Sequence, residues 1–264
     1  MVGRTPSFRL QGAIFMLGRI LGCVVLIILI CLSQSLAGQS LNDSHTNTQS
    51  PAIKQPPPTE GQISVVRLRV PRKAVELYNQ ALDAFEKQKL DDAKKRVEQA
   101  LKIHPSYPDA LTLRGGIHLE WQQWDAAAQD FRASIDTDPA FAPAYIGLAD
   151  ALNVEFRFDD ALAVLQRADQ LTPGAWNVQY ETSRALIGKH LYERALNVLE
   201  EALRARAPHD SLLRLAKAHA LVALGKLPEA AGELRAYLSS GSVEREDEAA
   251  RDLLNRIQAA VGGQ

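Results

Sequence analysis

Cysteine is nearly absent from this chain of 264 residues. Its only two cysteines, Cys23 and Cys31, lie within the first 37 residues. If those residues are removed, disulfides, thiol catalysis and cysteine-ligated metal sites are all excluded. No two of the six histidines are three or four residues apart, the spacing that a pair of metal ligands on a helix requires. Glycine-rich phosphate loops and the Gly-x-Ser-x-Gly nucleophile motif are also missing. We therefore expect no enzymatic activity, no metal and no cofactor.

An excess of positive charge is also lacking. The chain has 30 Lys and Arg against 31 Asp and Glu, a formal net charge of −1. Residues 1–37 contain three arginines and no acid, so their removal leaves 27 basic residues against 31 acidic ones. This balance does not favour a nucleic acid as the partner.

The sequence does contain a repeat with a period of 34 residues, the period expected when helix–turn–helix units stack on one another. One alanine position recurs in four units: Ala93, Ala127, Ala161 and Ala195. A second small position recurs in phase with it: Ala81, Gly115, Ala149 and Ser183. Proline keeps the same step, with one extra residue before the last: Pro105, Pro139, Pro173 and Pro208. We expect two antiparallel helices in each unit, with the small residues where they cross and proline after the second helix.

The turn inside each unit has its own pattern. Asp91 is predicted to cap the N-terminus of the second helix of the first unit. The equivalent acids of the next three units are Asp125, Asp159 and Glu193. A bulky apolar residue precedes each of these positions and is predicted to fill the space between neighbouring units: Leu90, Trp124, Phe158, Tyr192 and Leu227. For Trp121 and Trp124 a packing role is favoured over a binding role.

These positions resemble the tetratricopeptide repeat, in which small residues recur at the eighth, twentieth and twenty-seventh positions of each unit and a proline closes it. The resemblance covers about Ala74 to Leu238 and implies an all-α fold, a right-handed α-solenoid of about five helix–turn–helix repeats. The expected repeats are residues 74–107, 108–141, 142–175, 176–210 and 211–242.

A C-terminal helix, residues 243–264, is expected to cover the open end of the last repeat. Ser242 is its predicted N-cap. Its apolar stripe is predicted to consist of Ala250, Leu253, Leu254, Ile257 and Val261.

In that family the first helix of each repeat lines a concave face, so the resemblance implies a groove that binds an extended peptide or a helix. Carried over by position, the candidate groove residues are Tyr78, Leu82, Phe85, Thr112, Leu119, Ile146, Asp150, Asn153, Tyr180, Arg184, Leu215 and His219. The set of Lys, Arg and Asn with which some members clamp the C-terminal carboxylate of chaperones is missing here. Chaperone-tail binding is therefore not expected.

The N-terminus resembles a secretory signal peptide. Residues 1–37 combine a basic start, the apolar-or-small run from Ile20 to Leu32 and a small-residue exit at Ser35-Leu36-Ala37. The alternative is an uncleaved membrane anchor formed by residues 12–32. Cleavage is favoured because Arg19 would lie inside such a span. Residues 38–73 form a linker rich in Pro, Ser and Gln.

Together these features predict a protein exported to the periplasm or cell envelope. We expect a non-catalytic scaffold that binds a protein or peptide segment in its concave groove. Two alternatives stay open: a structural solenoid that associates with itself, and an accessory subunit of an envelope complex.

Overall fold

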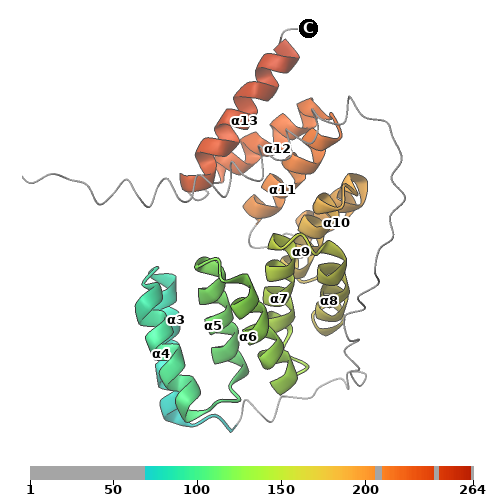
Figure 1. The fold of residues 1–264 in the computed structure, drawn as a ribbon. Coiled ribbons are helices and arrows are strands. Elements are labelled where there is room, and N and C mark those ends of the chain that lie inside the picture. The colour runs from blue at the N-terminus through green and yellow to red at the C-terminus, as the bar shows by residue number, and fades with distance from the viewer. Residues whose placement is uncertain (1–68, 206–209, 241–243, 263–264) are drawn as a thin grey trace, which may run out of the picture. The chain divides into compact units, whose positions relative to one another are not determined.

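The structure, a computed structural model, describes residues 69–205, 210–240 and 244–262. Within these residues it contains eleven α-helices and no strand, as the repeat pattern predicts. Ten helices form five pairs, and the eleventh follows the fifth pair (Figure 1). The pairs are α3 (Arg72–Glu86) with α4 (Leu90–Ile103), α5 (Pro108–Glu120) with α6 (Trp124–Thr137), α7 (Ala142–Val154) with α8 (Phe158–Leu171), α9 (Trp176–Gly188) with α10 (Tyr192–Arg204), and α11 (Asp210–Ala223) with α12 (Leu227–Ser239). The last helix is α13 (Glu244–Gly262).

Small residues lie where the two helices of a pair meet, as predicted. Ala81 of α3 and Ala93 of α4 are completely buried. In the second pair the space is tighter still, because a Cβ added at Gly115 would lie 2.8 Å from Cε1 of Phe131. A larger side chain at this position would push α5 away from α6. The equivalent alanines and serine of the later pairs are also fully buried: Ala127, Ala149, Ala161, Ser183, Ala195, Ala218 and Ala230.

Each turn between the helices of a pair contains one residue in the left-handed backbone conformation. These residues fall at the same repeat position: Gln88, Gln122, Phe156 and His190, with φ between 58° and 60°, and Gly225, with φ 73°. In the first turn, the N–H of Gln88 donates to the carbonyl of Phe85, and the N–H of Lys89 donates to the carbonyl of Ala84. This is the Schellman pattern that closes a helix C-terminus.

The prediction that Asp91 is an N-cap is wrong. Helix α4 already begins at Leu90, its N-cap is Lys89, and no side chain caps it. Asp91 therefore lies inside the first turn, where its charge interacts favourably with the positive end of the helix dipole. The same correction applies to the equivalent acids Asp125, Asp159 and Glu193, which all lie within the first turn of their helices.

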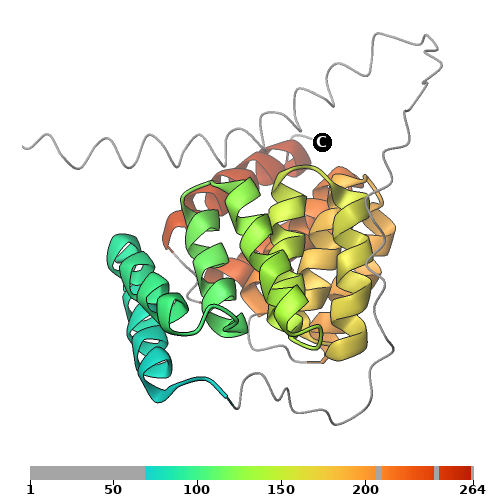
Figure 2. The same ribbon diagram turned by 60° about the horizontal axis from the view of Figure 1, so that its bottom comes forward.

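Aromatic side chains join consecutive pairs. Phe131 of α6 is buried between its own pair and the next, since its ring lies against Gly115 of α5 and Gly147 of α7. Phe158 of α8 packs in the same way against Gly188 of α9, which confirms its predicted role as a filler between units. Figure 2 shows the resulting side-by-side arrangement of α5 to α8, in green and yellow.

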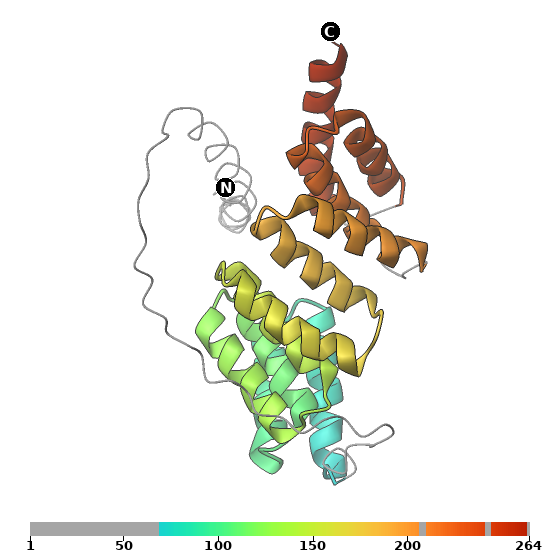
Figure 3. The same ribbon diagram turned by 90° about the vertical axis from the view of Figure 1, so that its right-hand side faces the viewer.

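The C-terminal helix packs on α12 (Figure 3). Ala250 and Ile257 are buried, and Leu253 and Leu254 pack against the same core cluster. Val261 departs from the predicted stripe, since this residue is 45% exposed in the last turn of α13. The predicted N-cap, Ser242, lies outside the described residues.

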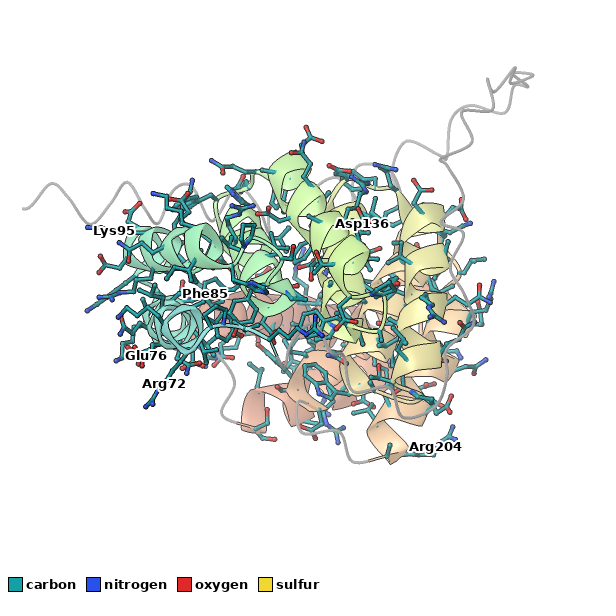
Figure 4. The ribbon with its side chains drawn as sticks, turned by 90° about the horizontal axis from the view of Figure 1, so that it is seen from below. Arg72, Glu76, Phe85, Lys95, Asp136 and Arg204 are labelled. Carbon is teal, nitrogen blue, oxygen red and sulfur yellow. The ribbon has the colours of Figure 1, made fainter. Side chains whose placement is uncertain are left out.

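The first pair presents polar side chains at the N-terminal end of the stack. Asn79, Gln80 and Asp83 of α3 are exposed, whereas the next repeat has buried Leu113 and Ile117 at the positions of Asn79 and Asp83. Figure 4 shows the charged side chains that project from this pair. A polar outer face is what the terminal unit of a repeat stack requires.

The expected signal segment, residues 1–37, and residues 38–68 of the expected linker lie outside the described residues. In the part of the chain that the structure describes, no helix is both long and apolar enough to cross a membrane.

Candidate functional site

The odd-numbered helices form the inner layer of the stack. Each of α3, α5, α7 and α9 contacts the next odd-numbered helix, in addition to its own partner. Among the described residues, no two of the even-numbered helices α4, α6, α8, α10 and α12 are in comparable contact. Consecutive repeats therefore approach one another most closely along their first helices, and side chains on this layer line a continuous inner face.

All twelve predicted groove residues lie on this inner layer. They fall into three rows, each of which takes the same position from successive repeats. The first row is Tyr78, Thr112, Ile146, Tyr180 and Leu215; the second is Leu82, Asp150, Arg184 and His219; the third is Phe85, Leu119 and Asn153. Asn153 is buried, His219 is exposed and the other ten are partly buried.

The inner face is apolar over the first repeats. The rings of Tyr78 and Tyr107 are tilted against each other with centroids 5.3 Å apart. Leu82 and Phe85 pack against the core cluster that α3, α4 and α5 share. Phe85, labelled in Figure 4, reaches across to α5, because a Cβ added at Gly116 would lie 3.8 Å from its Cζ. These side chains offer apolar contact area, and they also hold the first two repeats together.

Thr112 is engaged within its own repeat. Its hydroxyl donates to Oγ of Ser134 at 3.0 Å, and the Ser134 hydroxyl donates to the backbone carbonyl of Pro108 at 3.0 Å. The chain of two hydrogen bonds joins the start of α5 to α6.

The centre of the inner face is polar. Arg184 of α9 donates from Nη1 to Oδ1 of Asp150 on α7 at 2.5 Å. The same nitrogen lies 2.9 Å and 2.8 Å from the two carboxylate oxygens of Glu181, one turn earlier on α9. Asn153 of α7 donates from Nδ2 to Oε2 of Glu181 at 3.0 Å and to the Glu181 backbone carbonyl at 3.1 Å. We call these four residues the Asp150 cluster.

Burial sets the protonation of this cluster. The carboxyl of Glu181 is withdrawn from water, which raises its pKa to about 7, while the Arg184 charge opposes the rise and the Asp150 charge adds to it. For Arg184, burial lowers the pKa, but the two neighbouring carboxylates outweigh it and the pKa rises above its usual value. Arg184 thus stays charged, and Glu181 is the member that titrates near neutral pH.

The sequence profile of the tetratricopeptide repeat matches three segments, residues 78–140, 119–175 and 180–245, which together span more than half of the chain. The chain belongs to the tetratricopeptide repeat family. A search of curated proteins found no match.

Solved structures of tetratricopeptide repeat proteins share this fold. The protein TTC0263 of Thermus thermophilus is 20% identical, with 71% of this chain and 98% of that chain covered at a TM-score of 0.61. PilW, described as a widely conserved type IV pilus biogenesis factor, is 17% identical over 74% of this chain and 94% of its own, also at 0.61. The pilF protein of Pseudomonas aeruginosa is 17% identical over 72% and 90%, with a TM-score of 0.59. Tetratricopeptide repeat proteins are in general scaffolds for protein interaction, and at these identities the neighbours show the fold alone.

Two polar groupings of this tetratricopeptide repeat protein are not predicted from the sequence. The first is the contact of Glu181 with Arg184 on the same helix. Their spacing of three residues could have predicted it, because residues i and i+3 are neighbours on a helix surface. The other joins Arg114 of α5 to Asp130 of α6, with Nε to Oδ2 at 2.8 Å and Nη2 to Oδ1 at 2.5 Å. His118 lies beside it, with Nε2 3.7 Å from Oδ2 of Asp130. This second grouping ties the two helices of one repeat together.

Within the described ranges no three His, Cys, Asp or Glu side chains are grouped so that they could hold a metal ion. The inner face offers apolar contact area over the first repeats, and charges and hydrogen-bonding groups at the centre.

Proposed function

We propose that this chain is an exported, non-catalytic scaffold that binds a segment of another protein along the inner face of its repeats. The observation that supports it is the make-up of that face, where apolar side chains border the Asp150 cluster within one layer of helices. A segment lying across α3 to α9 would bury apolar area and find donors and acceptors at the centre.

The test is capture of the partner from cells of the source organism by three forms of the full chain. The first is the natural chain and the second carries Leu82→Ser, Ile146→Ser and Leu215→Ser on the inner layer. The third carries Ile103→Ser, Phe156→Ser and Val261→Ser, the large apolar residues that are more exposed. We expect the inner-layer variant to lose the partner and the outer variant to retain it. Because Leu82, Ile146 and Leu215 also pack against the core clusters, capture is measured below the unfolding temperature of each variant, as determined by circular dichroism. Retention by both variants would contradict the inner-face assignment.

Export is the second part of the proposal and is supported by the basic, apolar and small segments of residues 1–37. Mass spectrometry of the chain recovered from its native cells tests it. A mature N-terminus at Gly38 indicates cleavage, whereas an intact N-terminus in the membrane fraction indicates an anchor through residues 12–32.

Self-association is a second candidate function, and one observation favours it. Val261 is an exposed apolar residue at the end of α13, where a second copy would find apolar area. Sedimentation velocity over a range of concentrations tests this alternative. A mass that is independent of concentration for the full chain, and unaffected by Val261→Ser, would remove it.

A further inference from the structure

When both of its carboxyl groups are ionised, the Asp150 cluster carries more negative than positive charge. It contains two carboxyl groups, on Asp150 and Glu181, and one guanidinium, on Arg184, whose Nη1 contacts both. With both carboxyl groups ionised the cluster has one uncompensated negative charge, in a part of the protein where burial weakens the screening by water. Arg184 has no surplus positive charge with which to attract an anion. A cation placed here would complete the balance.

The oxygen best placed to meet such a cation belongs to Asp150. Its side chain is 35% exposed, and Arg184 occupies only Oδ1. Among the described residues no donor reaches its second carboxylate oxygen, Oδ2. The side chain of Asp150 therefore offers a charged acceptor to whatever lies along the inner face.

A second acceptor in the cluster lacks a donor. Asn153 is only 6% exposed and uses its Nδ2 to bind Glu181, but its Oδ1 accepts no hydrogen bond within the part of the chain that the structure describes. Buried carbonyl oxygens without a donor are rare and destabilising, so each one calls for an explanation. Asn153 follows Asp150 by three residues on α7, which places the two on the same side of that helix.

We propose that the Asp150 cluster is a subsite for a lysine or arginine side chain of the bound segment. The ammonium or guanidinium group would donate to Oδ2 of Asp150, while the buried Oδ1 of Asn153, which accepts no hydrogen bond among the described residues, adds its partial negative charge to the site. The flanking apolar residues Ile146 and Tyr180 would contact the methylene stem of the same side chain. This inference rests on the proposed function and adds the chemistry of the segment: apolar residues around one basic residue.

The test starts from a display library of random 12-residue peptides selected on the full chain. Lys or Arg is expected to be enriched at one peptide position. The best peptide is then synthesised with that residue and with neutral norleucine, and binding is measured by fluorescence anisotropy. On the natural chain the neutral peptide should bind about tenfold more weakly, the value of one charge-assisted hydrogen bond.

Two variants assign this preference to the cluster. With Asp150→Asn the two peptides should differ by less than about twofold, because the charge that distinguishes them is gone. Asp136→Asn makes the same chemical change at an exposed position of α6, labelled in Figure 4, and should leave the tenfold preference intact. Selection of acidic peptides, or a Lys preference that survives Asp150→Asn, would overturn the subsite.

Failure of the proposed function would look different. If selected peptides bind the natural chain and lose affinity for Ile146→Ser but show no preference for a cation, the inner face binds segments and the cation subsite is wrong. If no peptide is selected, or Ile146→Ser has no effect on any that are, the inner face is not the working surface and both proposals fall.

Discussion

The ring of Phe131 in α6 lies against Gly147 in α7, the first helix of the next repeat. The two helices are so close that a Cβ added at Gly147 would collide with the ring. Phe131 is buried, so its ring has little room to move aside. The close approach lets α6 and α7 pack together, and the hydrogen atom of Gly147 is the largest substituent that the site accepts. A glycine in the middle of a helix otherwise lowers helix stability, so its presence here is explained by packing.

We expect Gly147→Ala to destabilise the protein. Overpacking typically costs about 1–3 kcal/mol, and the added Cβ would lie less than 3.0 Å from Cε1 of the buried Phe131, which favours a cost above the roughly 1 kcal/mol gained when alanine replaces glycine in a helix. The matched control is Gly232→Ala in α12, where an added Cβ meets nothing within 4 Å and stabilisation is expected. Urea unfolding followed by circular dichroism measures both. A more stable Gly147→Ala variant would show that the Phe131 ring can be displaced without loss.

The turn positions give a second prediction, of opposite sign. Phe156 has φ 60° and is 64% exposed, so it bears the strain of the left-handed conformation and gains little burial in return. Phe156→Gly is expected to stabilise the chain by about 1 kcal/mol. In the fifth repeat the same position already holds Gly225, and Gly225→Ala should cost a similar amount. Thermal unfolding of the two variants checks the pair, and a common sign for both would contradict it.

The sequence predicts the helix pairs well because their constraint is local and repeated. Small residues such as Ala81 and Ala93 lie where the helices cross, and no distant contact is needed to place them. The start of α4, and with it the place of Asp91, could not be predicted in the same way. The first turn is closed by the left-handed residue Gln88 and the Schellman hydrogen bonds, so α4 starts at Leu90 and leaves Asp91 inside it.

The polar centre of the inner face could be predicted only in part. Asp150 and Arg184 are both assigned to the groove by repeat position, and the 34-residue step places them on neighbouring helices. That they bind each other, and that Glu181 joins them, depends on how closely α7 approaches α9. The same proximity buries Asn153 and Glu181, which a helix pattern taken repeat by repeat does not reveal.

The raised pKa of Glu181 makes stability depend on pH. Its pKa is about 7 in the folded chain against 4.5 in the unfolded one, so the folded state holds a proton between these values that the unfolded state has released. Stability from this group is therefore lost as pH rises from about 4.5 to about 7, by at most roughly 3 kcal/mol.

Glu181→Gln should abolish that dependence. It keeps the shape of the side chain and resembles the protonated acid, so the variant is expected to be more stable than the natural chain at pH 8 and similar to it at pH 4. Denaturant midpoints measured at both values test this, with Asp136→Asn as the control at an exposed carboxylate. A variant that is less stable at pH 8 would mean that the ionised carboxylate stabilises the fold.

Removing Arg184 should be more harmful than removing either carboxylate. Arg184→Met would leave Asp150 and Glu181 facing each other without a cation, and breaking a buried pair in this way typically costs about 3–5 kcal/mol. Asp150→Asn leaves the bond between Arg184 and Glu181 in place and should cost much less. If the charge imbalance is the cause, the double variant Arg184→Met with Glu181→Gln should recover much of the lost stability at pH 8, since only Asp150, whose side chain is partly exposed, then stays charged. Urea unfolding at pH 8 of Arg184→Met, Glu181→Gln and the double variant forms a double-mutant cycle that isolates the coupling. Additive effects would instead assign the loss to the cation–π contact with Tyr180, whose ring centroid lies 5.8 Å from the guanidinium carbon of Arg184.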